Sequence, residues 1–562
     1  MTTTLERGAP GPAEPSARRR GAGGGGPPRR RRRPGAPPRS LTAVSVVIAA
    51  LFAAPTAYLV IRNLGLGTEL LDAVTDPDTY GPLLRSLGLG VAVCATSTFI
   101  GVTLAWLTTR SDVPGRAVWR VLAPLPLVIP SFVGAAALRA GLAPGGLLAS
   151  LAEPLGIDRL PEIDGFVGAW LVLTLFTYPY VYLPTAARFA SLPPQLEESA
   201  RLLGRRPAAV FRTVVLPQAS TAIWAGTLLV FLYTISDFGA VSIMRFTTLT
   251  SEIYQSKLVP STWLPLALLL AVVALITVVL ERRAGRRRAR TDAVRARRAL
   301  AVPLGRWRWP AGVFVAFVLA NALIGPLAVL ATWAVRGLLD SGQRTGSLAI
   351  ANGPASLVGP AVNTVTVSVI AAVVAVALVL PVAYLTTRYR SRFGGATNAV
   401  VVAGFALPGL VVALSLVFWV LNIGGFAALY QTVPVLIFAY VVHFGAQAMR
   451  AGQVAVGAVP PKFDDAARML GAGRLRRLIT IELPLMRPGL LAGAGLVLLS
   501  VMKELPATLL LAPPNFQTLA TVIWSANESL YLAKMGLASL VLVGVSGVLT
   551  WLLVIRRAER FD

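Results

Sequence analysis

The sequence contains few of the residues on which soluble enzymes and disulfide-stabilised proteins depend. Only 14% of its 562 residues are charged, against about 25% in soluble domains, so a soluble fold is excluded. The one cysteine, Cys94, cannot form an intrachain disulfide, and its apolar surroundings predict a buried helical residue. The one histidine, His443, lies deep in another apolar run, where we expect a hydrogen-bonded packing residue rather than a metal ligand.

Lysine is also scarce, and the positions of the lysines exclude one activity. The phosphate-binding loop of nucleotide hydrolases requires a lysine directly after a glycine and before serine or threonine. None of the lysines follows a glycine: they are Lys257, Lys462, Lys503 and Lys534. We therefore expect a chain that is not an enzyme and has no ATPase of its own.

Long apolar runs are abundant. Hydrophobic residues make up 55% of the chain, and runs of about 20 residues, long enough to cross a bilayer as helices, recur throughout. The sequence therefore predicts an all-α polytopic membrane protein. We expect about twelve transmembrane helices, near residues 41–62, 86–107, 119–139, 166–187, 216–236, 262–281, 310–334, 362–385, 397–420, 428–448, 487–511 and 535–555. The first is too long for a cleaved signal sequence and has further spans after it, so we expect an uncleaved anchor.

The net charge of +27 comes mainly from two arginine-rich regions. Ten arginines lie between Arg7 and Arg39 in a Gly/Pro-rich tail, residues 1–40, which we expect to be disordered. Eleven more lie between Arg282 and Arg308. Both regions flank spans, where basic residues mark the cytoplasmic side and contact anionic lipid. With both termini cytoplasmic, the outer loops contain few basic residues: Arg159, Arg245, Lys257, Arg344 and Lys534. No aromatic interleaving accompanies the arginines, so nucleic acid is not an expected partner.

The two halves of the chain repeat each other. The run AWLTTR at 105–110 matches AYLTTR at 383–388, an offset of 278 that Pro130 and Pro408 share. The run FTTL at 246–249 matches FQTL at 516–519. Slowly drifting offsets indicate a duplication, and six spans in each half give both halves the same orientation. We expect a first half at 41–281, a basic cytoplasmic linker at 282–308, a second half at 309–556 and a cytoplasmic tail at 557–562.

The strongest repeat is a polar segment between spans four and five of each half. It reads PPQLEESARLLG at 193–204 and PPKFDDAARMLG at 460–471, an offset of 267. The prolines end the preceding span, the acids favour a helix N-terminus, and the glycine ends a short helix. Small residues between them allow a partner to approach closely. The candidate contact residues are Glu197, Glu198, Ser199, Ala200, Gly204, Asp464, Asp465, Ala466, Ala467 and Gly471. The alternative is an ordinary amphipathic loop helix.

These segments resemble the EAA motif of ATP-binding-cassette importer permeases, in which Glu-Ala-Ala, a glycine and Leu-Pro have fixed spacing. Both copies keep every spacing and end at Leu-Pro, at 216–217 and 483–484. The departures are conservative: Ser199, Val214 and Asp465. The resemblance implies a MetI-like permease fold in a bacterial cytoplasmic membrane, with two coupling helices that dock on two copies of a cytoplasmic ATPase. It implies no cofactor on this chain, with ATP and magnesium on the partner.

A second pair of polar sites lies at the outer ends of spans five and eleven. Ser236 and Asp237 in the first half correspond to Lys503 and Glu504 in the second. Ionisable residues at span depth are rare and commonly functional. The two acids are candidates for the substrate path and for transient contact with a cation, although no firm metal site is indicated. The alternative is structural, in which each acid caps a helix end or pairs with a base.

The runs SDFGAVS at 236–242 and KELPATL at 503–509 resemble segments of ferric-iron permeases. That resemblance implies uptake of iron(III) by alternating access, from an extracytoplasmic substrate-binding protein. Thiamine or a phosphonate remains open as the cargo. Two other classes also remain open: an ion-coupled secondary transporter with six plus six spans, and a membrane scaffold or receptor that moves no cargo.

Overall fold

A computed structural model describes residues 37–68, 70, 72, 76–156, 163–193, 195–286, 302–339, 346–350, 353–389, 391–404 and 407–550. Regular structure in these ranges is helical, and an isolated bridge between Ser111 and Val302 is their one β-type contact. The predicted all-α class is therefore confirmed. Most of the expected basic tail, residues 287–301 of the expected linker and the expected tail at 557–562 lie outside the described residues.

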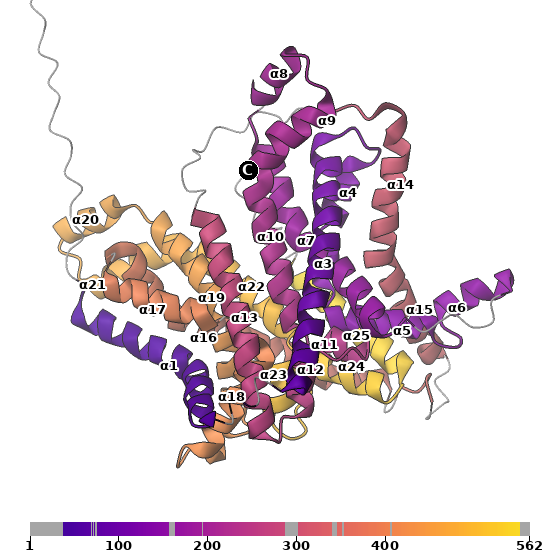
Figure 1. Ribbon diagram of the computed structural model, residues 1–562. Coiled ribbons are helices and arrows are strands. Elements are labelled where there is room, and N and C mark those ends of the chain that lie inside the picture. The colour runs from indigo at the N-terminus through magenta and orange to yellow at the C-terminus, as the bar shows by residue number, and fades with distance from the viewer. Residues whose placement is uncertain are drawn as a thin grey trace, which may run out of the picture. The chain divides into compact units, whose positions relative to one another are not determined.

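The helices follow the same order in both halves (Figure 1). The first half contains α1 (Arg39–Leu64), α3 (Pro77–Arg110), α4 (Arg116–Leu122), α5 (Ser131–Leu142), α6 (Leu147–Ala152), α7 (Gly165–Ser191), α8 (Gln195–Leu202), α9 (Pro207–Val210), α10 (Leu216–Ser236), α11 (Gly239–Ile243), α12 (Leu249–Gln255) and α13 (Pro260–Arg286). The second half contains α14 (Arg308–Leu319), α15 (Gly325–Leu339), α16 (Val358–Tyr384), α17 (Arg392–Ala403), α18 (Gly409–Asn422), α19 (Val433–Ala458), α20 (Pro461–Met469), α21 (Arg474–Arg477), α22 (Leu483–Met502), α23 (Pro506–Leu511), α24 (Leu519–Glu528) and α25 (Leu532–Thr550).

Ten helices of the described chain are long and apolar enough to cross a membrane, or eleven if one bent pair is counted as a span. The polytopic prediction is confirmed, but the expected count of twelve differs at the third span of each half. In the first half, 116–128 and 131–142 are separate helical segments bent by 95°. In the second half, α17 and α18 are separate helices. Pro130 and Pro408 stand directly before α5 and α18, and proline disfavours a helical conformation in the residue before it.

The two halves use the same local devices to build the same elements. In each half, the segment after the short outer helix ends in a threonine capping box, with Thr248 at the start of α12 and Thr518 at the start of α24. The backbone N–H of Leu249 donates to Ser86 Oγ at 2.8 Å, and that of Leu519 donates to Thr364 Oγ1 at 2.8 Å. The duplication read from the sequence therefore extends to individual hydrogen bonds.

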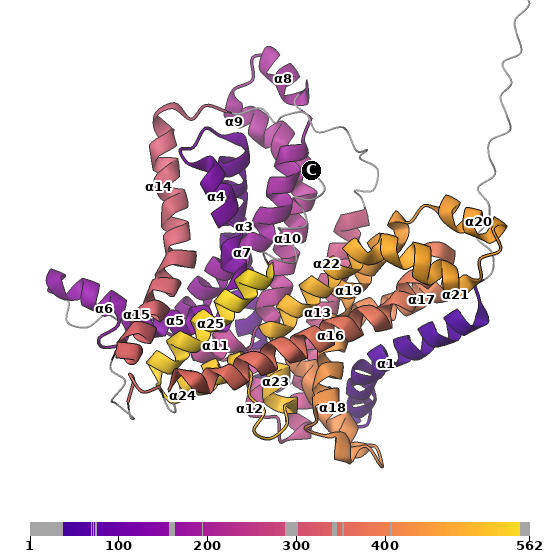
Figure 2. The ribbon, with the colours of Figure 1, turned by 180° about the vertical axis from the view of Figure 1, so that it is seen from behind.

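The first helix of each half packs against the other half. Helix α1 contacts α16, α17 and α18 of the second half, and α15 contacts α5 of the first. Phe52 of α1 is 1% exposed, and its ring lies where a side chain at Gly445 would otherwise be. In the reciprocal contact, Trp333 of α15 donates from Nε1 to the carbonyl of Ala140 at 2.9 Å. Helix α1 therefore lies along the second half (Figure 2), whereas α15 packs both on α5 and on α25 of its own half. The hydrophobic core contains residues from both halves.

Candidate functional site

The first candidate helix, α8, is held by a buried ion pair. Glu197 is 3% exposed and bonds through Oε1 to Nη1 of Arg110, which is 1% exposed and ends α3. The guanidinium of Arg110 also donates from Nε and Nη2 to the carbonyl of Phe189, at 2.8 and 2.6 Å. Arg110 therefore ties the start of α8 to the ends of α3 and α7, and a buried charge of this kind requires such partners.

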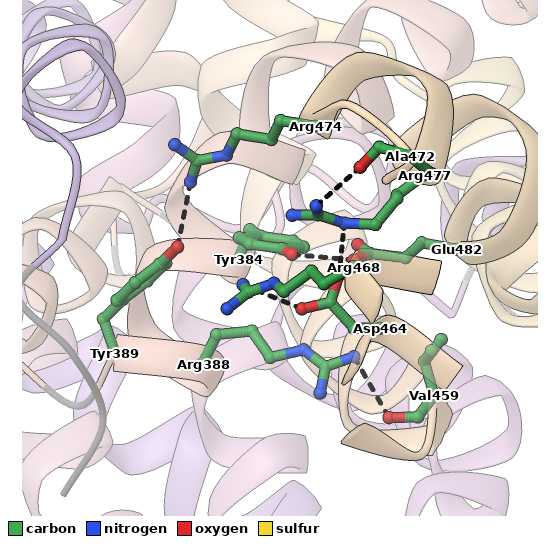
Figure 3. Close-up of polar contacts among 10 residues, drawn as sticks. All are labelled: Tyr384, Arg388, Tyr389, Val459, Asp464, Arg468, Ala472, Arg474, Arg477 and Glu482. Carbon is green, nitrogen blue, oxygen red and sulfur yellow. Dashed lines mark hydrogen bonds and ion pairs between the residues drawn. The ribbon is translucent and has the colours of Figure 1, made fainter. Parts of the chain in front are cut away.

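The second candidate helix, α20, is held by a different set of bonds (Figure 3). Asp464, the counterpart of Glu197, bonds to Nη2 of Arg468 at 2.9 Å and to Nε of Arg477 at 2.7 Å. Arg388, the counterpart of Arg110, donates instead to the carbonyl of Val459 at 3.0 Å. The acid of this half is therefore bonded within the α20–α21 segment, whereas the acid of the first half is bonded to the end of a long helix.

The backbone that ends α8 and α20 is the same in both halves. Gly204 has φ +77° and Gly471 has φ +75°, a left-handed conformation that favours glycine. The N–H after each glycine donates to the carbonyl five residues back, from Arg205 to Ala200 at 3.2 Å and from Ala472 to Ala467 at 3.0 Å. A π-helical turn then leads into each Leu-Pro, at Phe211–Val215 and at Leu478–Glu482. The predicted glycine stops are confirmed.

The remaining predicted contact residues divide between an inner and an outer face. Ala200 and Ala467 are buried against the protein, at 8% and 6% exposure. The exposed members are Glu198, Ser199, Gly204, Asp465, Ala466 and Gly471. Next to them, two apolar pairs at equivalent positions point into solvent: Leu202 and Leu203, and Met469 and Leu470, all more than 80% exposed. Glu198 and Asp465 lie four residues before Leu202 and Met469, so each short helix presents an acid and a large apolar side chain on one accessible face, and a second apolar side chain follows directly.

At the other end of α10, Asp237 caps a short helix. It is 8% exposed, and its Oδ1 accepts from the backbone N–H groups of Ala240 at 2.9 Å and Val241 at 3.4 Å, at the start of α11. Its Oδ2 accepts from the hydroxyl of Ser131, which also accepts from the Tyr233 hydroxyl at 3.1 Å. Ser236 is half-buried beside it at the end of α10. Asp237 therefore has the bonds expected in the structural alternative, in which the acid caps a helix end.

Glu504 has a related but looser arrangement in the second half. Its Oε1 accepts from the backbone N–H of Ala507 at 3.3 Å, at the start of α23. The counterpart of Ser131 is Gly409, and a Cβ added there would lie 2.6 Å from Glu504 Oε1. Glutamate is longer than aspartate, and the Glu504 side chain thus occupies the space that the Ser131 side chain occupies in the first half. Lys503 Nζ donates across to the first half, to the carbonyl of Leu127 at 2.7 Å.

Burial shifts the charge states of these groups. Desolvation raises the pKa of Glu504 to about 7, against the opposing effect of the Ala507 N–H. Desolvation also lowers the pKa of Lys503 to about 8. The pKa of Asp237 is raised by desolvation, and the bonds from Ser131, Ala240 and Val241 oppose that rise. The second-half acid and base therefore both titrate nearer neutrality than their ordinary values.

The two halves meet at this end of the helices. The rings of Phe238 and Trp524 lie 5.3 Å apart, and those of Trp263 and Phe418 lie 5.2 Å apart. Asp237 and Glu504 each bond within their own half. Across the described ranges, no group of three or more His, Cys, Asp or Glu side chains is placed to hold a metal ion. The two acids are therefore held by hydrogen bonds at the starts of α11 and α23.

Several residues with a role in these sites carried no prediction from the sequence. Arg110 and Arg388 were visible only as the matching last letters of AWLTTR and AYLTTR. A basic residue repeated at the same end of a span could have indicated a partner for the acids. Nothing in the pattern distinguishes Arg477 or Glu482, because their first-half counterparts are the apolar Val210 and Val215.

Comparison with known proteins places these features in a family. Two stretches of the chain, residues 97–292 and 379–558, match the family described as "Binding-protein-dependent transport system inner membrane component". There is one match in each half, and together they cover more than half of the chain. Each match includes one of the two short helices, α8 or α20.

Individual relatives agree with that assignment. The chain is 28% identical over 528 residues to the Fe(3+)-transport system permease protein FbpB 2 of Haemophilus influenzae, covering 92% of this chain and 99% of that protein. It is 26% identical to the probable ABC transporter permease protein y4fN of Sinorhizobium fredii, covering 78% of this chain and 81% of that protein. A shorter match, 30% identical, is to the sulfate transport system permease protein CysT of Escherichia coli K12, over 30% of this chain and 60% of that protein.

Proposed function

Because this chain belongs to the family of binding-protein-dependent transport system inner membrane components, we propose that it is the permease of an ATP-driven importer whose cargo is iron(III). It is a multi-pass membrane protein that carries two family domains on one chain. One such chain replaces the usual pair of permease subunits. Both termini are cytoplasmic in this proposal, as the arginine distribution favours.

Helices α8 and α20 are the coupling helices, and each docks on one copy of a separate ATPase that binds ATP and magnesium. The observation that carries this assignment is the exposed face of each helix, where an acid stands one turn before two large apolar side chains. Exposed apolar clusters in otherwise polar segments favour a protein partner. The buried anchors beneath them, Glu197 with Arg110 and Asp464 with Arg477, allow a push on the helix to reach α3 and α22.

Transport follows alternating access, with an extracytoplasmic binding protein delivering cargo to the outer side. The far ends of α10 and α22 lead into contacts between the halves, including Phe238 with Trp524. Helices α8 and α20 lie well apart in both views (Figures 1 and 2). Contact between the halves at these far ends, together with the separation of α8 and α20, supports a state that is closed on the outer side. Approach of the two coupling helices, driven by ATP, would open that side.

Iron(III) is the proposed cargo because the relative that matches nearly the whole chain is a permease for Fe(3+) transport. Asp237 and Glu504 line the proposed outer mouth as transient oxygen contacts rather than as a resident site. The cargo is tested with the reconstituted permease and ATPase, supplied in turn with binding proteins for iron(III), thiamine and a phosphonate. We expect only the iron-loaded protein to raise ATP hydrolysis several-fold; transport by the permease alone would overturn the ATP-driven assignment.

The coupling helices are tested with the double variant E198K/D465K. We expect a loss of ATPase co-purification and of transport by at least about tenfold, because both exposed acids reverse sign while the buried anchors remain. Glu528→Lys, an equally exposed acid at the other end of the molecule on α24, is the matched control and retains both. Unchanged transport in the double variant would contradict the assignment.

A further inference from the structure

The second half contains a cavity of about 430 Å³ beside α20, within the size range of small-molecule sites. Its walls come from α1, α16, α20, α21 and the π-helical turns Leu385–Tyr389 and Leu478–Glu482. Three apolar spans, Arg39–Leu64, Pro354–Tyr389 and Arg474–Val501, begin or end at this cavity. The cavity therefore lies at the level where the bilayer meets water.

One wall of the cavity is rich in hydrogen-bond donors (Figure 3). Arg474 donates from Nη2 to the hydroxyl oxygen of Tyr389 at 2.9 Å. That bond uses one of the several N–H donors of the guanidinium, and it leaves the Tyr389 proton able to donate. Arg468 and Arg477 line the same wall. A planar guanidinium beside a phenol is well suited to a phosphate group.

The floor of the cavity contains an acceptor without a donor. Glu482 is 4% exposed, and its Oε1 accepts from the Tyr384 hydroxyl at 3.1 Å. Its other oxygen, Oε2, is buried and has no hydrogen-bond partner among the described residues. A buried carboxylate oxygen left without a donor is costly. Because Glu482 lines the cavity, a positively charged group of a bound molecule would compensate the charge of its carboxylate.

The opposite wall is apolar and is shared with the lipid-facing helix α1. It consists of Leu41, Val44, Ala377, Leu380 and Pro381. Val44 is 47% exposed, so this wall continues onto the outer surface of the protein. An occupant that extends from the polar wall along this surface has an apolar tail.

The lining of this cavity is not repeated in the first half, where larger or apolar side chains stand at the equivalent positions. Trp106 and Phe211, the counterparts of Tyr384 and Leu478, pack edge to face with ring centres 6.0 Å apart. Val210 and Val215 replace Arg477 and Glu482 and are 2% and 4% exposed. The polar lining is therefore a specific feature of the second half and does not follow from the shared fold.

We propose that this cavity binds a phospholipid whose headgroup carries both a phosphate and an ammonium group, as phosphatidylethanolamine does. The phosphate lies at Arg474 and Tyr389, the ammonium group lies against the Glu482 carboxylate, and an acyl chain follows the wall of α1 and α16. The basic segment before α1 is a poorer occupant, because its arginines would meet the arginines of the cavity. This site does not depend on the function proposed above.

The test is native mass spectrometry of the full chain in detergent, titrated with phosphatidylethanolamine, phosphatidylglycerol and soluble glycerophosphoethanolamine. We expect phosphatidylethanolamine to bind about tenfold more tightly than phosphatidylglycerol, because only its ammonium group makes a charge-assisted bond to Glu482. Arg474→Ala lowers that affinity about tenfold. Arg476→Ala, a neighbour on α21 that is exposed and does not line the cavity, leaves it unchanged.

Two further variants separate the parts of the ligand. Glu482→Gln removes the preference for phosphatidylethanolamine over phosphatidylglycerol, and Val44→Trp, at an exposed position, weakens lipid binding without weakening any binding of glycerophosphoethanolamine. Equal losses in R474A and R476A would overturn the site, as would a lipid preference that survives E482Q. Binding of glycerophosphoethanolamine as tight as that of the lipid would show a site for a soluble phosphate compound and would overturn the lipid assignment.

Discussion

Helices α8 and α20 have the same backbone but different anchors. Both end at a left-handed glycine, both are followed by a π-helical turn, and both present two exposed apolar side chains. Glu197, however, bonds to a fully buried arginine from α3, whereas Asp464 bonds to Arg468 and Arg477, its own neighbours in the chain. The duplicated helices have thus kept the same backbone and the same exposed apolar side chains, but the bonds that hold each helix to the rest of the protein differ.

The difference predicts unequal stiffness in the two segments. A buried pair that loses one partner leaves a charge without compensation, while a pair with an exposed arginine is screened by water. Arg468 is 57% exposed and Arg110 is 1% exposed. We therefore expect α8 to move with α3 as one body, and the α20–α21 segment to respond more to local changes around it.

The largest expected effect comes from removing the two anchoring acids in turn. Glu197→Ala lowers the free energy of unfolding by about 3–5 kcal/mol, because Arg110 remains buried with only a carbonyl partner. Asp464→Ala lowers it by less, about 1–2 kcal/mol, because Arg468 regains water and Arg477, which is 12% exposed, keeps the Ala472 carbonyl as a partner. Thermal unfolding in detergent, followed by tryptophan fluorescence, measures both.

A paired replacement controls for lost packing in this comparison. The double variant R110M/E197L removes both charges at once, and we expect it to recover most of the stability lost in E197A. Equal losses in E197A and D464A would contradict the inferred difference between the two anchors.

The acids that follow α10 and α22 give a pH-dependent comparison. The pKa of Glu504 is raised to about 7 from 4.5, so the folded state holds a proton in this range that the unfolded state has released. Stability from this group is greatest below pH 4.5 and is lost as pH rises through 7. In the Glu504→Gln variant this pH-dependent loss is absent. The free energy of unfolding of the variant, relative to that of the original chain, should therefore rise by about 3 kcal/mol between pH 4.5 and 7.

Asp237→Asn is the first-half counterpart, measured over the same pH range. We expect a smaller change than for Glu504→Gln, because Ser131 and two backbone N–H groups stabilise the Asp237 carboxylate. Parallel pH curves for E504Q and the original chain would show that Glu504 keeps its ordinary pKa.

The smallest expected effect tests what the two halves share. Gly204→Ala and Gly471→Ala should each cost about 1 kcal/mol, since both positions need a left-handed backbone. Gly395→Ala, inside α17 where an added Cβ meets nothing within 4 Å, is the control and should cost nothing. A clear difference between G204A and G471A would mean that the backbones of α8 and α20 are less alike than their hydrogen bonds indicate.

The sequence predicted the features that depend on short-range chemistry. The glycine stops at 204 and 471 and the duplicated halves followed from residue type and spacing. The third span of each half was predicted as continuous because apolar length outweighed Pro130 and Pro408, although proline is a local break signal. The eleventh predicted span likewise ran through Lys503 and Glu504, where the structure ends α22 at Met502 and begins α23 at Pro506.

Features that depend on contacts between distant segments could not be read from one sequence. The bond from Lys503 to Leu127 joins residues 376 positions apart, and no periodicity encodes such a pair. The same holds for the cavity beside α20: its existence depends on how Tyr384, Arg474 and Glu482 are brought together, not on their spacing.

The contact of each first helix with the other half has a consequence for assembly. Helix α1 packs mainly on the second half, and α15 packs both on α5 of the first half and on α25 of its own. Each half alone would therefore leave a helix face uncovered. Joining them in one chain makes their association intramolecular, with an effective concentration that for short tethers is about millimolar. The two unlike halves therefore always meet in a one-to-one ratio, and a permease with two identical halves cannot assemble from a single copy of this chain.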